Sequence, residues 1–237
     1  MNVIDIIIVM LLIMSSIVGW KKGVIKEVVS LIGIILVFVI SFSLKEQLGN
    51  ILCKFLPFFN FGGNLEGLVS LNILMYQFIA FFIIYSVLYG IYALILKLSG
   101  VLQKIINITL ILALPSKLAG AVVGLLKGYI VIFVVMIILL IPFKNIDIFR
   151  NSTLINKITN NTPILSTYTK NINNTVSDIY KLGENLTTKK LTVNEANIQT
   201  IDTMLKYDIV SKKTIEQLVV LDKLKTVKGL DNILSKY

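Results

Sequence analysis

The apolar run over residues 118–141 has the length of a membrane helix and opens on three glycines spaced four residues apart. The glycines are Gly120, Gly124 and Gly128, and Lys127 stands among them. Lipid gives no hydrophobic reward for helix association, so small residues at this spacing are used where two helix backbones approach closely in a membrane. The run therefore predicts a transmembrane helix built to pack against another helix.

The composition predicts that the bilayer buries most of this chain, because 56% of its residues are hydrophobic, 15% are charged and the mean hydropathy is +0.85. About 20 residues are needed to cross a hydrocarbon core of about 30 Å. Four stretches suffice, at residues 3–20, 25–43, 70–96 and 118–141. The run at residues 105–114 is too short and stops at Pro115, so we expect a re-entrant or interfacial helix there.

The expected fold class is therefore all-α, a polytopic membrane domain over residues 1–143 followed by a small helical tail. The first span lacks preceding basic residues and a following small-residue cleavage site, so we expect it to be retained. Lysines cluster in the first and third connections, at Lys21, Lys22, Lys26, Lys97, Lys104 and Lys117. These connections are expected to be cytoplasmic, and the charge-balanced residues 44–69 to be outside. Four spans then place both termini outside, although the basic residues that follow the last span argue the other way.

The tail divides by composition into two parts. Residues 144–190 are rich in Asn and Thr and predict a flexible spacer with one amphipathic helix around residues 176–182. Residues 191–237 predict a small helical domain: Asn194 with Glu195 can start one helix, Ser211 can cap a second, and Gly229 precedes a short last one. This domain is either a self-packed helical hairpin or a docking platform for a partner or a membrane surface.

Several classes of chemistry are excluded by composition. The chain has no histidine and one cysteine, Cys53, which rules out Ser-His-Asp triads, HExxH zinc sites, cysteine metal clusters and an intrachain disulfide. A Ser-Lys dyad would have to use Lys127. We therefore predict no enzyme, no metal and no cofactor. The net charge of +10 is shared evenly between membrane domain and tail, which favours lipid headgroups over nucleic acid as the partner.

Ionisable residues at membrane depth carry the most specific signal, because they are costly in lipid and face a partner or a wet cavity. They are Asp5, Lys26, Glu27 and Lys127. Asp5 stands where a carboxylate complements the positive end of the first helix. Glu27 and Lys127 either approach each other across a close contact of the second and fourth helices, or Lys127 snorkels to the interface while Glu27 is solvated. The sequence leaves both alternatives open.

Two separated motifs resemble the colicin V production protein (CvpA) family. The first comprises Ile4-Asp5, Ser15-Ser16 and KGVIKEVVSL at residues 22–31, and the second is KLAGAVVGLLKG at residues 117–128. Pro115-Ser116 replaces a polar Asn-Arg or Asp-Arg step of relatives, and the tail has no counterpart. The resemblance covers residues 1–143 and implies a multi-pass bacterial inner-membrane protein linked to toxin or bacteriocin production or export and to envelope integrity.

Two functions follow as alternatives. The first is a non-enzymatic membrane scaffold or assembly factor whose glycine faces, Gly19 with Gly23 and the three glycines of the fourth span, pack protomers or partner helices. It implies a homo-oligomer or another membrane-protein partner. The second is an oligomeric transporter or channel component for a small solute or ion. Its path would be lined by Asp5, Asn72, Gln77 and Lys127.

Overall fold

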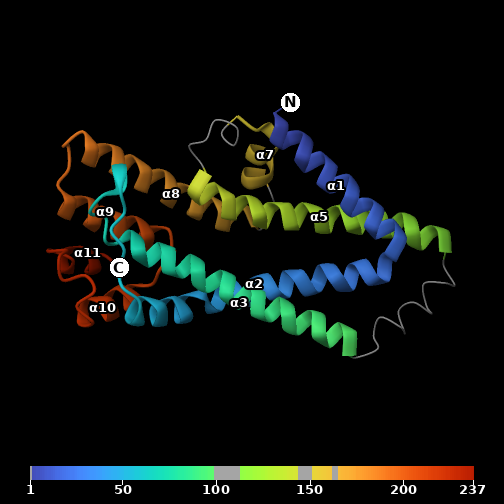
Figure 1. The fold of residues 1–237 in the computed structure, drawn as a ribbon, viewed down its shortest axis with the longest axis horizontal. Helices are drawn as coiled ribbons and strands as arrows, with labels where there is room; N and C mark the ends of the chain where they lie inside the picture. The colour runs from blue at the N-terminus through green and yellow to red at the C-terminus, as the bar shows by residue number, and fades with distance from the viewer. Residues whose placement is uncertain (1, 99–112, 144–150, 162–164) are drawn as a thin grey trace. The chain divides into compact units, whose positions relative to one another are not determined.

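The computed structural model describes residues 2–98, 113–143, 151–161 and 165–237, and this part of the chain contains helices and no strand (Figure 1). Four helices are long and apolar enough to cross a membrane, as predicted. They are α1 (Val3–Lys22), α2 (Val24–Phe55), α3 (Leu71–Leu98) and α5 (Ala113–Phe143). The shorter elements are η1 (Gly63–Leu65), α7 (Thr153–Asn161), α8 (Leu165–Thr187), α9 (Val193–Lys206), α10 (Lys212–Val220) and α11 (Asp231–Leu234).

Helix α2 continues well past the predicted end of the second span at residue 43. Its last turns carry Lys45, Glu46 and Lys54 but no proline, and Leu52 and Cys53 pack into a hydrophobic core. The rise of 1.5 Å per residue carries Phe55 about 18 Å beyond Ser43 along the helix axis. The polar end of α2 therefore has the length to leave the hydrocarbon layer.

Pro115 was expected to stop the apolar run before it, but in the structure it is the third residue of α5. Proline is tolerated in a first helical turn because the N–H that it lacks would have no intrahelical partner there. Residues 113 and 114 thus belong to the spanning helix. The rest of the predicted short helix over residues 105–114 lies outside the described residues.

Residues 144–190 differ from the predicted flexible spacer, since their described part forms α7 and all of α8, and α8 includes the one helix predicted around residues 176–182. Each helix buries a stripe of apolar residues at helical spacing within an otherwise Asn- and Thr-rich sequence. The buried residues are Ile155 and Ile158 in α7 and Val176, Ile179 and Leu182 in α8. Such a stripe forms a helix when a neighbouring surface buries it, so polar composition alone was misleading.

The chain divides into two compact units that are not the linear domains predicted from sequence. The first comprises residues 1–39 and 86–169, and the second comprises residues 40–85 and 170–237. The reason is the length of α2, α3 and α8, each of which contributes to both units. In the first unit α1 and α5 lie side by side (Figure 1), and α7 contacts both of them.

The core of the second unit joins the tail to the polar ends of α2 and α3. Cys53, Ile73 and Tyr76 pack in one cluster with Met204 of α9 and Ile215 of α10. The tail is therefore not a self-packed hairpin. The first residues of the tail helices agree closely with those predicted from the sequence.

Local capping explains those helix starts. Ser211 caps α10 by accepting a hydrogen bond from the Thr214 amide at 3.3 Å, as predicted. Helix α9 begins slightly earlier than predicted, because Thr192 and Glu195 form a reciprocal capping box. Gly229, at φ +86°, makes the turn before α11, a conformation that other residues rarely adopt.

Contacts within each unit bring together segments that lie at the ends of different long apolar helices. Asp5, at the start of α1, bonds to Ser152, which follows α5. Asn197 of the tail bonds to Ser70 in the connection before α3. Two spans, α3 and α5, separate that connection from the tail, as a return to the same side requires. Four spans are thus consistent with the folding of both units.

Candidate functional site

The glycines singled out from the sequence form a close crossing of α1 and α5. A Cβ added at Gly120 would lie 2.5 Å from the carbonyl oxygen of Gly19 and 2.8 Å from the carbonyl carbon of Gly23. One added at Gly124 would lie 2.6 Å from the carbonyl oxygen of Ser15. These neighbours are backbone atoms that cannot move aside. The two helices can approach this closely only because the side chains are missing.

Two serines of α1 complete the crossing. The Ser15 hydroxyl donates to the Gly124 carbonyl at 2.6 Å, and the Ser16 hydroxyl donates to the Ala121 carbonyl at 3.2 Å. Gly128 faces the Ser15 side chain, whose Cβ would be 2.6 Å from an added methyl group. Small residues, which allow close packing, and interhelical hydrogen bonds both favour the association of helices in lipid. The serines appeared in the family-like motif, but the sequence did not indicate their bonds.

The glycine-lined contact is between the first and fourth helices, whereas the sequence analysis had left the partner of the glycine faces open. Gly23 belongs to it twice, since it packs against Gly120 and, at φ +79°, makes the turn between α1 and α2. At the same turn the Ser116 hydroxyl accepts a hydrogen bond from the Val24 amide at 3.4 Å. This bond satisfies one of the free N–H groups at the start of α2.

Glu27 and Lys127, which the sequence analysis pairs as one of two alternatives, form an ion pair between α2 and α5. The Glu27 side chain is fully buried, and that of Lys127 is 12% exposed. Oε1 of Glu27 faces the ammonium group, whereas Oε2 has no hydrogen-bond partner among the described residues. A carboxylate that is buried in a span with one oxygen unsatisfied is energetically costly. Among the described residues, Gln77 of α3 also has a buried side-chain oxygen without a hydrogen-bond partner, but that group is neutral.

Asp5 has a larger role than the helix-dipole interaction predicted for it. Oδ2 accepts a hydrogen bond from the Asn2 amide at 3.2 Å, which caps α1. Oδ1 accepts bonds from the Ser152 hydroxyl at 2.5 Å and the Leu154 amide at 3.1 Å. Asp5 therefore also holds the start of α7. Lys26, the fourth charge singled out at membrane depth, is half-buried and has no ion pair among the described residues.

Asn72 and Gln77, predicted to line a transport path with Asp5 and Lys127, have other partners. Asn72 exchanges two hydrogen bonds with the Phe59 backbone, at 2.8 and 2.9 Å. The Gln77 amide group lies 3.4 Å from Asn50 and packs on Gly49. Both belong to the second unit, whereas Asp5 and Lys127 belong to the first.

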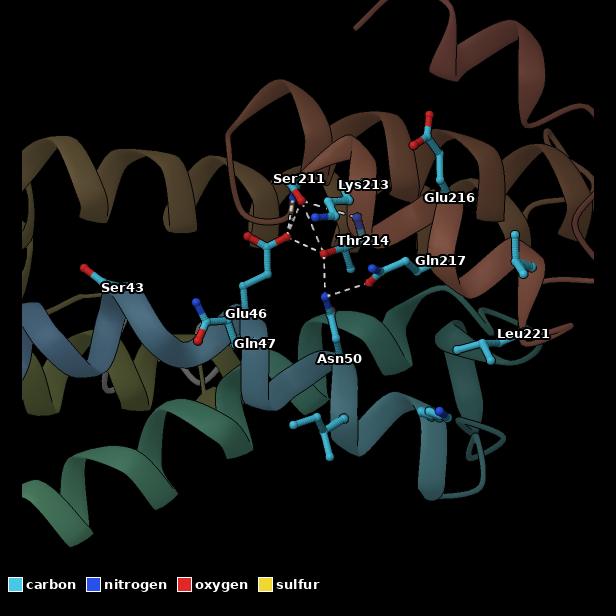
Figure 2. Close-up of a pocket in the computed structure, with 13 residues that line it drawn as sticks. Ser43, Glu46, Gln47, Asn50, Ser211, Lys213, Thr214, Glu216, Gln217 and Leu221 are labelled. Atoms are coloured by element: carbon cyan, nitrogen blue, oxygen red, sulfur yellow. Dashed lines mark hydrogen bonds between the residues drawn. The ribbon is translucent and has the colours of Figure 1, made fainter.

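A second candidate site is a groove of about 800 Å³ between α2 and α10 in the second unit, lined by both polar and apolar residues (Figure 2). Glu46 of α2 closes one end by accepting hydrogen bonds from the Ser211 amide at 2.8 Å, the Ser211 hydroxyl at 2.5 Å and the Thr214 hydroxyl. Asn50 donates to the same Thr214 hydroxyl at 2.9 Å. A membrane-helix carboxylate thus caps α10, a role that sequence spacing could not indicate.

No group of three or more metal-ligating side chains occurs among the described residues.

Comparison with known proteins places the chain in a family. No curated protein and no solved structure matches the chain. A family model described as colicin V production protein matches residues 4–163, which include all of α2, α3, α5 and α7 and all but the first residue of α1. Because this match covers more than half of its length, the chain belongs to the colicin V production protein family.

Proposed function

We propose that the protein is a non-enzymatic membrane scaffold that supports production or export of a toxin or bacteriocin peptide in the inner membrane of a bacterium. The observation that carries the proposal is the second unit, in which the tail helices are fixed to the polar ends of two membrane helices. Asn197 alone makes three bonds to the connection before α3, to Ser70 N, Ser70 Oγ and Gly67 O at 2.8 to 2.9 Å. A helical platform held this firmly at a membrane suits the recruitment of another protein.

The distribution of lysines supports an outer location for this platform. Lys21, Lys22, Lys97 and Lys117 flank the turn between α1 and α2 and the connection between α3 and α5. Positive charge favours the cytoplasmic side, which leaves the tail and the amino terminus outside. Labelling whole cells with an impermeant thiol reagent after Cys53→Ala and Ser235→Cys substitution tests this orientation. Labelling supports it, and protection until the membrane is permeabilised contradicts it.

The function is tested by complementation of a deletion strain that secretes its own bacteriocin, with secreted bacteriocin activity as the readout. We expect Asn197→Ala, which removes the bonds to Ser70, to lower activity while the protein stays in the membrane. Asn232→Ala, an exposed position in the same tail, is the matched control. Equal secretion by both variants at equal membrane abundance would contradict the scaffold proposal.

A transport component is the second candidate, and Glu27 is the observation that favours it. A fully buried carboxylate in a span, with one oxygen lacking a hydrogen-bond partner, is typical of ion or proton pathways. The double change Glu27→Gln with Lys127→Gln keeps two hydrogen-bonding side chains in contact and removes both charges. Secretion that survives the double change but not Asn197→Ala supports the scaffold. The reverse pattern supports transport.

A further inference from the structure

The glycine faces that the sequence offered for oligomer formation are occupied inside the chain. Gly19 and Gly23 of α1 pack against Gly120 and Gly124 of α5, so the backbones of one copy fill the space that a second copy would need. A contact between copies therefore has to use another surface. The groove between α2 and α10 is the strongest candidate in the described part of the chain.

The groove combines an apolar centre with balanced charge. Among the residues that line it, Val220 is 84% exposed, Ile51 is 51% exposed and Leu221 is 38% exposed. Helix rise places Ile51 about 12 Å along α2 from Ser43, past the first charged residues that follow the apolar stretch. Contact with lipid hydrocarbon therefore does not explain why these apolar side chains are exposed. Clustered exposed apolar residues mark a protein contact.

Charged residues line the same groove in equal numbers. They are Glu46, Lys54, Lys213 and Glu216 (Figure 2). Glu46 is engaged with Ser211 and Thr214, whereas Lys213 and Glu216 are exposed and have no ion-pair partner among the described residues. They lie three positions apart on α10, so both are on one face of the helix. A surface with both signs of charge around an apolar centre is complementary to itself.

We propose that this groove is the contact between two copies of the chain, in which Lys213 of one copy faces Glu216 of the other. Anchoring in one bilayer gives both copies the same orientation, so their two-fold axis lies along the membrane normal. An isologous contact then uses the same patch twice, and each Lys213–Glu216 pair occurs twice per dimer. The apolar side chain of Val220 lies at its centre.

Disulfide crosslinking of the full-length protein in native membranes tests the contact. In a Cys53→Ala background, Val220→Cys is expected to give a crosslinked dimer under mild oxidation, and Ser235→Cys, exposed elsewhere on the tail, is the matched control. Val220 is mostly exposed, so its substitution leaves the fold of the single chain intact. Equal crosslinking at the two positions, or capture of an unrelated protein at Val220 in place of the dimer, overturns the proposal.

Charge reversal tests the pairing and separates it from random collision. Glu216→Lys alone places like charges together twice per dimer, and exposed pairs are each worth about a two- to fivefold change in affinity. We expect about a tenfold lower dimer association constant for Glu216→Lys and for Lys213→Glu, measured by crosslinking at Val220→Cys. Mixing differently tagged Glu216→Lys and Lys213→Glu chains restores opposite charges at both pairs. Failure of the mixture to form the heterodimer overturns the proposal and leaves the scaffold function untouched.

Discussion

Replacing Gly120 by alanine tests how much the close crossing of α1 and α5 stabilises the membrane domain. The added methyl carbon would lie 2.5 Å from the Gly19 oxygen, whereas an ordinary carbon–oxygen contact is about 3.3 Å or longer. The obstructing atoms are backbone, so the helices have to separate by up to about 1 Å. A gap of that size forfeits about a quarter to a half of each affected van der Waals contact.

The cost can be estimated from these displacements. Overpacking typically costs about 1–3 kcal/mol, and lengthening the Ser15–Gly124 hydrogen bond adds about 0.6–1.7 kcal/mol. Alanine offsets about 1 kcal/mol through its better helix propensity. The net loss of unfolding free energy is therefore expected to be about 0.6–3.7 kcal/mol. The single tryptophan, Trp20, lies next to Gly19 and reports on this crossing.

The assay is SDS-driven unfolding in mixed micelles, followed by Trp20 fluorescence. Gly90→Ala is the matched control, because Gly90 is also in a membrane helix but a Cβ there meets no atom within 4 Å. We expect Gly90→Ala to be neutral or stabilising by up to about 1 kcal/mol. If Gly120→Ala unfolds within about 0.5 kcal/mol of Gly90→Ala, the ordinary error between surface variants, the steric argument is wrong.

Three further predictions concern the charges and the tail. Lys127→Glu or Glu27→Lys alone should destabilise the membrane domain by about 3–5 kcal/mol, because each leaves buried like charges, and the double reversal should recover most of it in the same SDS assay. Asn197→Ala should speed hydrogen exchange in α9, with unchanged exchange contradicting its docking role. The pKa of Glu195 is lowered because its carboxylate accepts bonds from the Thr192 amide and hydroxyl. The free energy that the ionised Glu195 carboxylate contributes to folding is fully present above the unfolded pKa of about 4.3. It is lost as the pH falls through the lower pKa of the folded state. Glu195→Gln should abolish that acid dependence of α9 helicity, and an unchanged circular dichroism titration would contradict this.

The spans could be predicted from the sequence because hydrocarbon thickness fixes the length of an apolar helix. Glycine spacing also identified the residues of the crossing, since only small side chains permit such an approach. It could not identify their partner, because spacing describes one face of one helix. The sequence therefore left open whether the glycines face another copy, a partner helix or, as in the structure, each other across α1 and α5. The Glu27–Lys127 pair was one of two alternatives that only the structure could separate.

The tail was harder to predict because its stability depends on distant residues. Helix α10 could be located from Ser211 and its apolar stripe, but Glu46 caps it from a position 165 residues earlier. The stripe of α8 is embedded in Asn and Thr, so the composition suggested a spacer with one helix around residues 176–182 rather than a helix over the whole of Leu165–Thr187. In each case the local pattern was present, and the surface that makes it stable is supplied by α2 or α3 or by another part of the chain.

The cap that Glu46 provides for α10 has a consequence for biogenesis. The tail core also needs Cys53, Ile73 and Tyr76, which arrive on membrane helices that are synthesised and inserted first. The carboxy-terminal helices emerge last and find their stabilising surface only when α2 and α3 are already threaded with the correct orientation. A misinserted hairpin would leave the tail unfolded and open to proteolysis. Folding of the tail thus acts as a check that insertion has succeeded.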